Sequence, residues 1–126
     1  MSWWKPKSKE GTRGKGDLAE QIACDHLEQS GYRIVERNFH CKLGEIDIIA
    51  RQGDELIFVE VRSKHSSATI DPVFSVNRGK QNRIARAAQV YLDRRFRRPP
   101  FCRFDVVIVT MGRPPKVEVI PNAFGT

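Results

Sequence analysis

The sequence predicts an α/β fold, with a mixed β-sheet of about five strands flanked by helices. Two apolar, β-branched runs flank Gly53-Asp54 and predict a hairpin over residues 44–62. Segments with helical apolar spacing lie before and after this hairpin, and residues 103–110 form the nearly continuous apolar run of a strand covered on both faces. A strand, a helix and a buried strand in that order predict a parallel pair with a right-handed crossover. The sheet should therefore mix antiparallel and parallel neighbours, with helices on its faces.

The first helix is predicted over residues 16–30, where apolar residues recur at the i, i+3, i+4 spacing. Gly31 follows as the residue that ends the helix, and a first strand is expected over residues 32–39. Glu20 lies at the margin of the apolar face, where a glutamate is more often solvated than functional. We expect that face to be buried and to contain Leu18, Ala19, Ile22, Ala23, His26 and Leu27.

The hairpin turn fixes the register of the two strands that it joins. A two-residue turn at residues 53–54 is favourable, since Gly adopts positive φ without cost and Asp tolerates it. This turn places Gln52 opposite Glu55 and Asp47 opposite Glu60. Because side chains alternate along a strand, one face of the hairpin should be wholly apolar. That face is expected to contain Ile46, Ile48, Ala50, Ile57, Val59 and Val61.

The other face of the hairpin is apolar near the turn and acidic at its far end. There Asp47 and Glu60 are predicted side by side, followed by Glu45 opposite Arg62. Opposed side chains have Cβ atoms roughly 5 Å apart. Two carboxylates about 4 Å apart repel by roughly 4 kcal/mol at an effective dielectric near 20. A positive group must therefore lie between them, either a divalent metal with oxygen ligands or a neighbouring Arg or Lys.

The rest of the chain supplies a loop, a second helix and two strands. Residues 63–76 are polar and read as a loop, and residues 116–120 as the last strand. A helix over residues 78–96 ends before two prolines. Its buried residues are expected to be Ile84, Ala88, Tyr91 and Leu92.

Length and composition indicate one domain. The chain has 126 residues, and residues 1–15 are basic and without periodicity. We expect these 15 residues to be a flexible arm, either untethered or touching phosphates while a Trp stacks on a base, and residues 16–126 to be the single domain. No apolar run approaches the roughly 20 residues that span a bilayer, and the N-terminus shows no signal segment, so we expect no membrane. Three widely spaced cysteines fit a cytoplasmic protein.

The charge balance favours a polyanionic partner. Lys and Arg total 22 against 15 Asp and Glu, for a net charge of +7. The second helix carries Lys80, Arg83, Arg86 and, near its end, Arg94. These side chains could line a track for nucleic-acid phosphates, although solvated helix residues would give the same pattern.

Several sequence blocks in order resemble a known bacterial family, the YraN-type proteins. Asp47 followed by Glu60-Val61-Arg62 is similar to the metal-site pattern of the restriction-endonuclease-like (PD-(D/E)XK) superfamily, an acidic residue and then Glu-x-Lys. The YraN-type family resembles the archaeal Holliday junction resolvases in fold. The further blocks that carry the resemblance are Glu20, Gly31-Tyr32, Arg37-Asn38, Gly44-Glu45-Ile46-Asp47, Phe58-Val59-Glu60-Val61, Lys80, Arg103-Phe104-Asp105-Val106-Val107 and Asn122-Ala123-Phe124.

The resemblance implies a restriction-endonuclease-like fold and a metal-dependent endonuclease that hydrolyses DNA phosphodiester bonds, in branched or otherwise structured DNA. On the matching positions, Asp47 and Glu60 would hold Mg²⁺ or Mn²⁺, with the backbone carbonyl of Val61 and the carboxylate of Glu20 as further ligands. A divalent ion activates water and stabilises charge on the phosphate. Cleavage of a junction would favour a symmetric homodimer.

Arg62 departs from the superfamily pattern, which has Lys at this position. Lys can be tuned by burial to assist proton transfer, whereas Arg stays charged and cannot act as a base. Arg62 could grip the scissile phosphate with two hydrogen bonds, or simply pair with Glu45. Lys64 lies on the same face as Glu60 but about 13 Å along the strand, so it would replace the missing Lys only if the strand bends or ends early.

Two further functions fit the same residues. In one, the nuclease fold has lost its chemistry through Arg62 and binds nucleic acid without cleaving it. In the other, the protein is a scaffold that pairs with another protein through the hairpin or an exposed strand edge.

Overall fold

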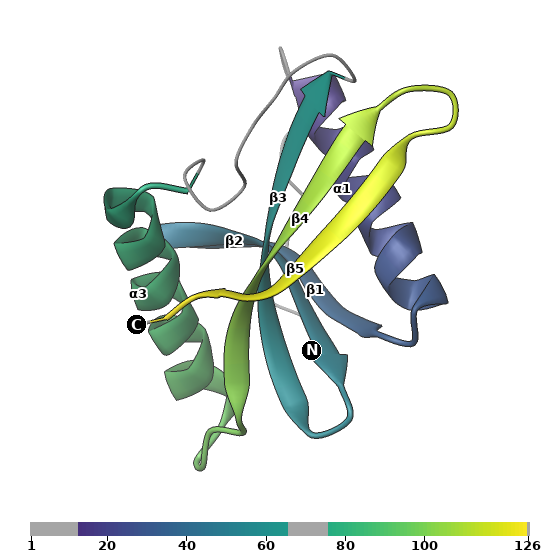
Figure 1. Ribbon diagram of the computed structural model, residues 1–126. Helices are drawn as coiled ribbons and strands as arrows, with labels where there is room; N and C mark the ends of the chain where they lie inside the picture. The colour runs from purple at the N-terminus through teal and green to yellow at the C-terminus, as the bar shows by residue number, and fades with distance from the viewer. Residues whose placement is uncertain (1–12, 66–75, 126) are drawn as a thin grey trace.

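The computed structural model describes residues 13–65 and 76–125 of the chain (Figure 1). Within these two ranges, two helices and five strands follow one another in the predicted order. None of the helices in this part of the chain combines the length and apolar character needed to cross a membrane. The elements are α1 (Arg13–Gln29), β1 (Arg33–Cys41), β2 (Gly44–Gln52), β3 (Glu55–His65), α3 (Arg78–Arg95), β4 (Cys102–Met111) and β5 (Lys116–Phe124).

The five strands form one mixed sheet in the order β1-β2-β3-β4-β5. β3 and β4 are parallel, and every other neighbouring pair is antiparallel. The α/β class, the mixed sheet and the parallel pair are therefore confirmed. The predicted hairpin register is confirmed near the turn, where Gln52 pairs with Glu55 and Ile49 with Phe58, and Gly53 has a φ of 58°.

The two helices cover opposite faces of the sheet and define two apolar layers (Figure 1). On the α1 side the sheet contributes Ile48, Ala50, Ile57, Val59, Val107 and Val109. On the α3 side it contributes Phe39, Ile46, Ile49, Leu56, Phe58, Phe104, Val106 and Ile108. Burying a side chain of this size stabilises the fold by roughly 1.5–3 kcal/mol, so each layer contributes to the stability of the fold.

Several predicted boundaries are wrong. α1 begins at Arg13, inside the expected arm, and residues 1–12 with the two Trp lie outside the described residues. β3 continues to His65 because its polar end still pairs with β4, so residues 63–65 of the expected 63–76 loop are strand, and residues 66–75 lie outside the described residues. β5 extends past the predicted end at 120 to Phe124. In α1, Leu18 is 51% exposed, whereas the rest of the predicted buried face is buried or half-buried.

The placement of Ile46 on the α1 side is also wrong, and Asn38 gives the reason. Asn38 has a φ of 55°, which reverses the alternation of side chains along β1. Arg37 therefore bonds Gln21 of α1 (2.9 Å), while the ring of Phe39 lies edge-on to Tyr91 of α3. Ile46 pairs with Phe39 and belongs to the same α3-side layer.

A polar network centred on Arg103 of β4 joins residues of β3, β4 and the segment before β1. The guanidinium of Arg103 donates hydrogen bonds to Asp105 (3.0 Å), Glu55 (2.8 Å) and the hydroxyl of Tyr32 (3.1 Å). Asp105 is fully buried and also accepts a bond from the backbone N–H of Asn122 (2.9 Å). A buried carboxylate is tolerated when it is paired and hydrogen-bonded in this way. The network fixes β5 against β4.

β1 and α3 are tied by a buried ion pair. Arg95 donates to Oε1 of Glu36 (3.0 Å) and lies 5.5 Å from the ring centre of Tyr91. The side chain of Glu36 is only 2% exposed, against 37% for Arg95. Burial raises the pKa of Glu36 above its ordinary value of 4.5, and Arg95 offsets part of that effect.

The raised pKa of Glu36 predicts a pH-dependent loss of folding stability. Above pH 4.5 the folded state keeps a proton that the unfolded state has lost, so stability falls as the pH rises through this window. We expect Glu36→Gln to gain stability relative to wild type over the same window, by about 1.4 kcal/mol for each unit of raised pKa. Thermal unfolding at stepped pH measures this gain. Glu118→Gln, at an exposed position of β5, controls for net charge. A gain independent of pH would contradict the expectation.

Candidate active site

Asp47 lies where β2 leaves its partner β3. The paired register of the two strands runs from Gln52–Glu55 to Ile48–Val59. One residue further, Oδ2 of Asp47 accepts a hydrogen bond from the backbone N–H of Val61 at 2.8 Å. A side chain thus replaces the backbone partner that a regular ladder would supply, and the two strands separate at this point.

Glu60 lies on the same strand as Val61 and is buried, with 4% of its side chain exposed. Its Oε2 is 2.8 Å from Nζ of Lys80 and 3.7 Å from the guanidinium of Arg62. A buried carboxylate without a cation would be strongly destabilising, so these contacts offset the cost of burying Glu60. One of the two alternatives left open by the sequence, a neighbouring cation, is therefore present.

Lys80 reaches this position because α3 begins close to the sheet. Asn77 caps the helix, and its side chain accepts a hydrogen bond from the backbone N–H of Lys80 at 2.9 Å. The side chain of Lys80 is 37% exposed. Sequence reasoning assigned Lys80 only to a phosphate track, because the spacing of α3 does not show which strand residue the first turn faces.

The two candidates for a catalytic cation on β3 differ in position. Arg62 is half-buried beside Glu60. Lys64 pairs with Thr110 in the regular part of the β3–β4 ladder, so the strand neither bends nor ends before it. Lys64 therefore stays four residues beyond Glu60, about 13 Å away along the strand.

Glu20 is positioned by α1 and is buried there. Its Oε1 lies 3.8 Å from the guanidinium of Arg37 on β1. Within residues 13–65 and 76–125, no group of three or more Asp, Glu, His or Cys side chains is arranged to hold a metal ion. The structure thus does not gather Glu20 with Asp47 and Glu60 into one acidic cluster, and Glu20 as a metal ligand stays a prediction.

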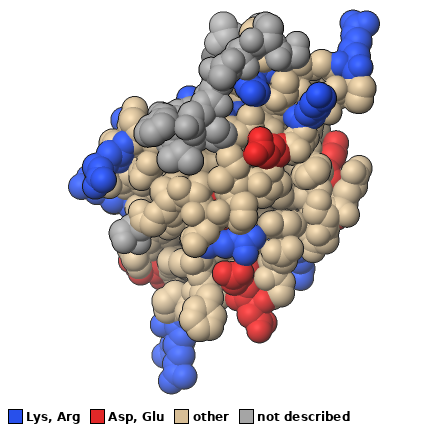
Figure 2. All heavy atoms as spheres, in the orientation of Figure 1, with Lys and Arg blue, Asp and Glu red and all other residues tan. Residues whose placement is uncertain are grey.

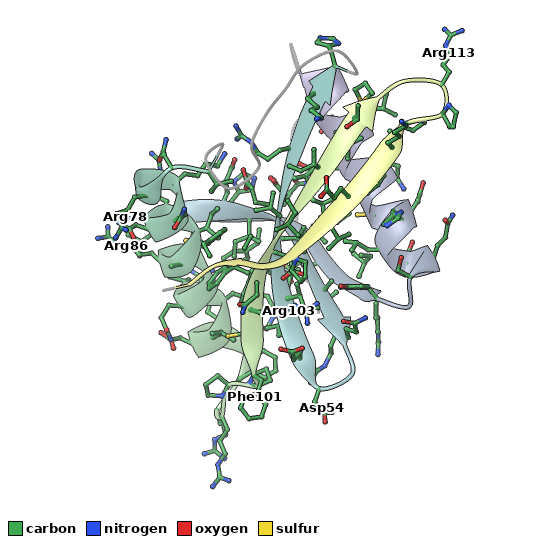
Figure 3. The ribbon with its side chains drawn as sticks, viewed as in Figure 1. Asp54, Arg78, Arg86, Phe101, Arg103 and Arg113 are labelled. Atoms are coloured by element: carbon green, nitrogen blue, oxygen red, sulfur yellow. The ribbon has the colours of Figure 1, made fainter. Side chains whose placement is uncertain are left out.

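The other basic residues of α3 face solvent. Arg83, Arg86 and Arg94 are exposed, and Figure 3 shows Arg78 and Arg86 pointing away from the sheet on the same side of the helix. On the face drawn in Figure 2, Lys and Arg side chains project at several separate places along the rim, with acidic groups between them. On this face the Lys and Arg side chains therefore do not form a single broad patch.

A cavity of about 320 Å³ adjoins the Glu60–Lys80 pair, between the β1–β2 turn and α3. β2 meets the helix closely here, since a Cβ on Gly44 would lie 2.5 Å from the backbone oxygen of Arg83. Nδ1 of His40 lies 3.1 Å from Oε2 of Glu45 at the cavity. Its lining residues are His40, Cys41, Gly44, Glu45, Lys80, Arg83 and Ile84.

Sequence comparison relates this site to a family of bacterial proteins. The model of the Uncharacterised protein family UPF0102 matches residues 19–109, a span that includes Asp47, Glu60 and Lys80. The chain belongs to the UPF0102 family. A UPF0102 protein of Moorella thermoacetica is 46% identical over 115 residues, covering 89% of this chain and 96% of the relative. One of Geobacter metallireducens is 42% identical over 110 residues, covering 86% and 90%. The YraN-type resemblance is thereby confirmed at the level of the UPF0102 family.

The bond between Asp47 and Val61 predicts how this UPF0102 protein responds to substitution. Asp47→Ala leaves the half-buried N–H of Val61 without its acceptor, and should lower the free energy of unfolding by about 1–3 kcal/mol. Asp47→Asn keeps an oxygen acceptor and should lose less. Urea unfolding of the two variants, with circular dichroism as the signal, measures the difference. Equal losses in both would show that the bond contributes little.

Proposed function

We propose that this protein is a metal-dependent endonuclease of the restriction-endonuclease-like fold, acting on phosphodiester bonds in DNA. One observation carries the proposal: at the point where β2 and β3 separate, the carboxylate of Asp47, the buried carboxylate of Glu60 and the amine of Lys80 come from three adjoining elements. A structural ion pair would need only the last two groups. The mixed sheet with a helix on each face, and the resemblance of Asp47 and Glu60-Val61-Arg62 to the superfamily pattern, support the same reading.

The donor groups suit Mg²⁺ or Mn²⁺. These hard cations take oxygen ligands, and Mg²⁺ commonly binds to one or two carboxylates while keeping several waters. Asp47 and Glu60 supply two carboxylates. In a strand, the N–H and C=O of one residue point to the same neighbour, so the carbonyl of Val61 is directed to the side from which Asp47 receives the N–H. A metal held by these residues would activate an attacking water and neutralise charge on the phosphate.

Lys80 provides the amine that position 62 lacks. An ammonium 2.8 Å from Glu60 holds that carboxylate in place and can donate a proton from Nζ, whereas a guanidinium stays protonated. Arg62, 3.7 Å from the same carboxylate, is then left to grip phosphate oxygens with its planar fork. Catalysis would therefore use the helix for proton handling and the strand for phosphate binding.

The exposed basic side chains of α3 support DNA as the substrate. Arg83, Arg86 and Arg94 follow Lys80 along a helix of 18 residues, which is about 27 Å long. A helix of this length presents cations to successive phosphates leading away from the site. Lys64, beyond Glu60 on β3, would contact phosphates on the side of the site away from α3.

A second function is favoured by the cations around Glu60. Lys80 and Arg62 already neutralise this carboxylate, so the same site could bind nucleic acid without cleaving it. In that case Arg62→Lys would restore the superfamily pattern and raise activity. In the nuclease that we propose, the amine of Lys80 is already present and Arg62→Lys should give no gain.

The nuclease proposal is tested with linear, flapped and four-way-junction DNA in Mg²⁺ or Mn²⁺. We expect Asp47→Asn and Glu60→Gln each to lower the cleavage rate at least about 100-fold, as loss of groups that stabilise the transition state does. Lys80→Met should lower it to a similar extent. Lys116→Met, at an exposed position of β5, makes the same change away from the site and should cleave normally. Cleavage that persists in both Asp47→Asn and Glu60→Gln would contradict the proposal.

The role of α3 in binding DNA is tested by salt dependence. Each phosphate contact contributes about 0.9 to the slope of log affinity against log salt concentration. We expect Arg86→Gln to reduce the slope by about that amount for any DNA sequence. Arg113→Gln, in the β4–β5 turn far from α3 (Figure 3), removes the same charge and should leave the slope unchanged. Equal slopes for the two variants would place the DNA elsewhere.

A further inference from the structure

The cavity between the β1–β2 turn and α3 is not used by the chemistry described above. It adjoins the proposed cleavage site through Lys80, which lines it and also contacts Glu60. We propose that this cavity receives a single unpaired nucleotide next to the phosphate that is cut. This inference rests on the proposed function and narrows its substrate class to DNA with an unpaired nucleotide.

The lining has the chemistry of a nucleotide pocket. Lys80 and Arg83 supply cations for a phosphate, and the planar guanidinium of Arg83 can also stack on a base or bond to its edge. Cys41 and Ile84 offer an apolar wall. The His40–Glu45 contact, with both side chains about half exposed, presents hydrogen-bonding groups beside that wall. The lining thus combines a short apolar wall with several convergent polar and charged groups, and such polar groups fix the orientation of a ligand and provide specificity.

The size of the cavity sets which form of DNA fits. A volume of about 320 Å³ is at the lower end for ligand pockets and suits one nucleotide, not a stacked base pair. A base inside a duplex must leave its stack to enter, and this costs least where the base is already unpaired. The cavity therefore favours bulged, flapped or single-stranded positions over continuous duplex.

The walls of the cavity are held in place before any ligand arrives. The backbone of Gly44 lies directly against the backbone of Arg83, with no room for a Cβ between them. Asn77 fixes the first turn of α3 through the N–H of Lys80. When a pocket is preformed, little of the binding free energy is lost in ordering its walls.

The test compares two DNA probes in EDTA, where binding is measured without hydrolysis. One probe is a continuous duplex, and the other is the same duplex with one unpaired 2-aminopurine as a bulge. We expect wild type to bind the bulged probe about tenfold more tightly and to raise its fluorescence as the base leaves the stack. Cys41→Phe, which fills the cavity, should bring the affinity ratio close to one.

Matched variants separate the cavity from general effects. Cys102→Phe, at an exposed position of β4, makes the same substitution elsewhere and should keep the ratio. Arg83→Gln should lower the ratio, whereas Arg86→Gln should weaken binding of both probes equally. Arg83 is exposed, so this pair remains informative if Cys41→Phe proves unfolded by circular dichroism.

Two results would overturn the inference: equal affinities of wild type for the two probes, or a preference that persists in both Cys41→Phe and Arg83→Gln. The outcome is independent of catalysis. A bulge preference without cleavage in any metal would retain the cavity and reject the nuclease. Cleavage of all DNA forms without a bulge preference would retain the nuclease proposal and reject the role of the cavity.

Discussion

The hydrogen bond from the backbone N–H of Val61 to Asp47 is the interaction on which the rest of the site depends. It ends the β2–β3 ladder while the parallel β3–β4 ladder continues, so along the same residues one edge of β3 is paired with β4 and the other is paired with none of the described strands. The open edge is where a strand can offer backbone oxygen to something other than a neighbouring strand. An interior strand that is paired along both edges has no backbone groups to spare for ligands.

The burial of Glu60 explains why α3 is part of the site rather than only a cover for the core. A carboxylate that is 4% exposed needs compensating charge, and the first turn of α3 supplies it through Lys80. The apolar residues of α3 position the helix, and the N-cap at Asn77 fixes where its first side chains point. Core packing and site electrostatics are thus set by the same element.

Local patterns predicted most of the fold. The 53–54 turn predicted the hairpin register correctly from Gln52–Glu55 to Ile48–Val59, because a two-residue loop leaves no freedom in pairing. The face of Ile46 was not predictable, since it depends on a positive φ at Asn38 in the neighbouring strand, and Asn adopts this conformation only in some contexts. The contact of Lys80 with Glu60 joins residues 20 apart in sequence and depends on how α3 docks, which periodicity does not encode.

The absence of a side chain at Gly44 has a mechanical consequence. Backbone atoms of β2 and α3 touch there, and no flexible side chain lies between them to absorb displacement. A shift of the start of α3 must therefore carry the beginning of β2 with it. Asp47 is three residues along β2 from this contact, and Lys80 is three residues before Arg83 on α3. The acidic and basic halves of the site are thereby coupled through a direct backbone contact.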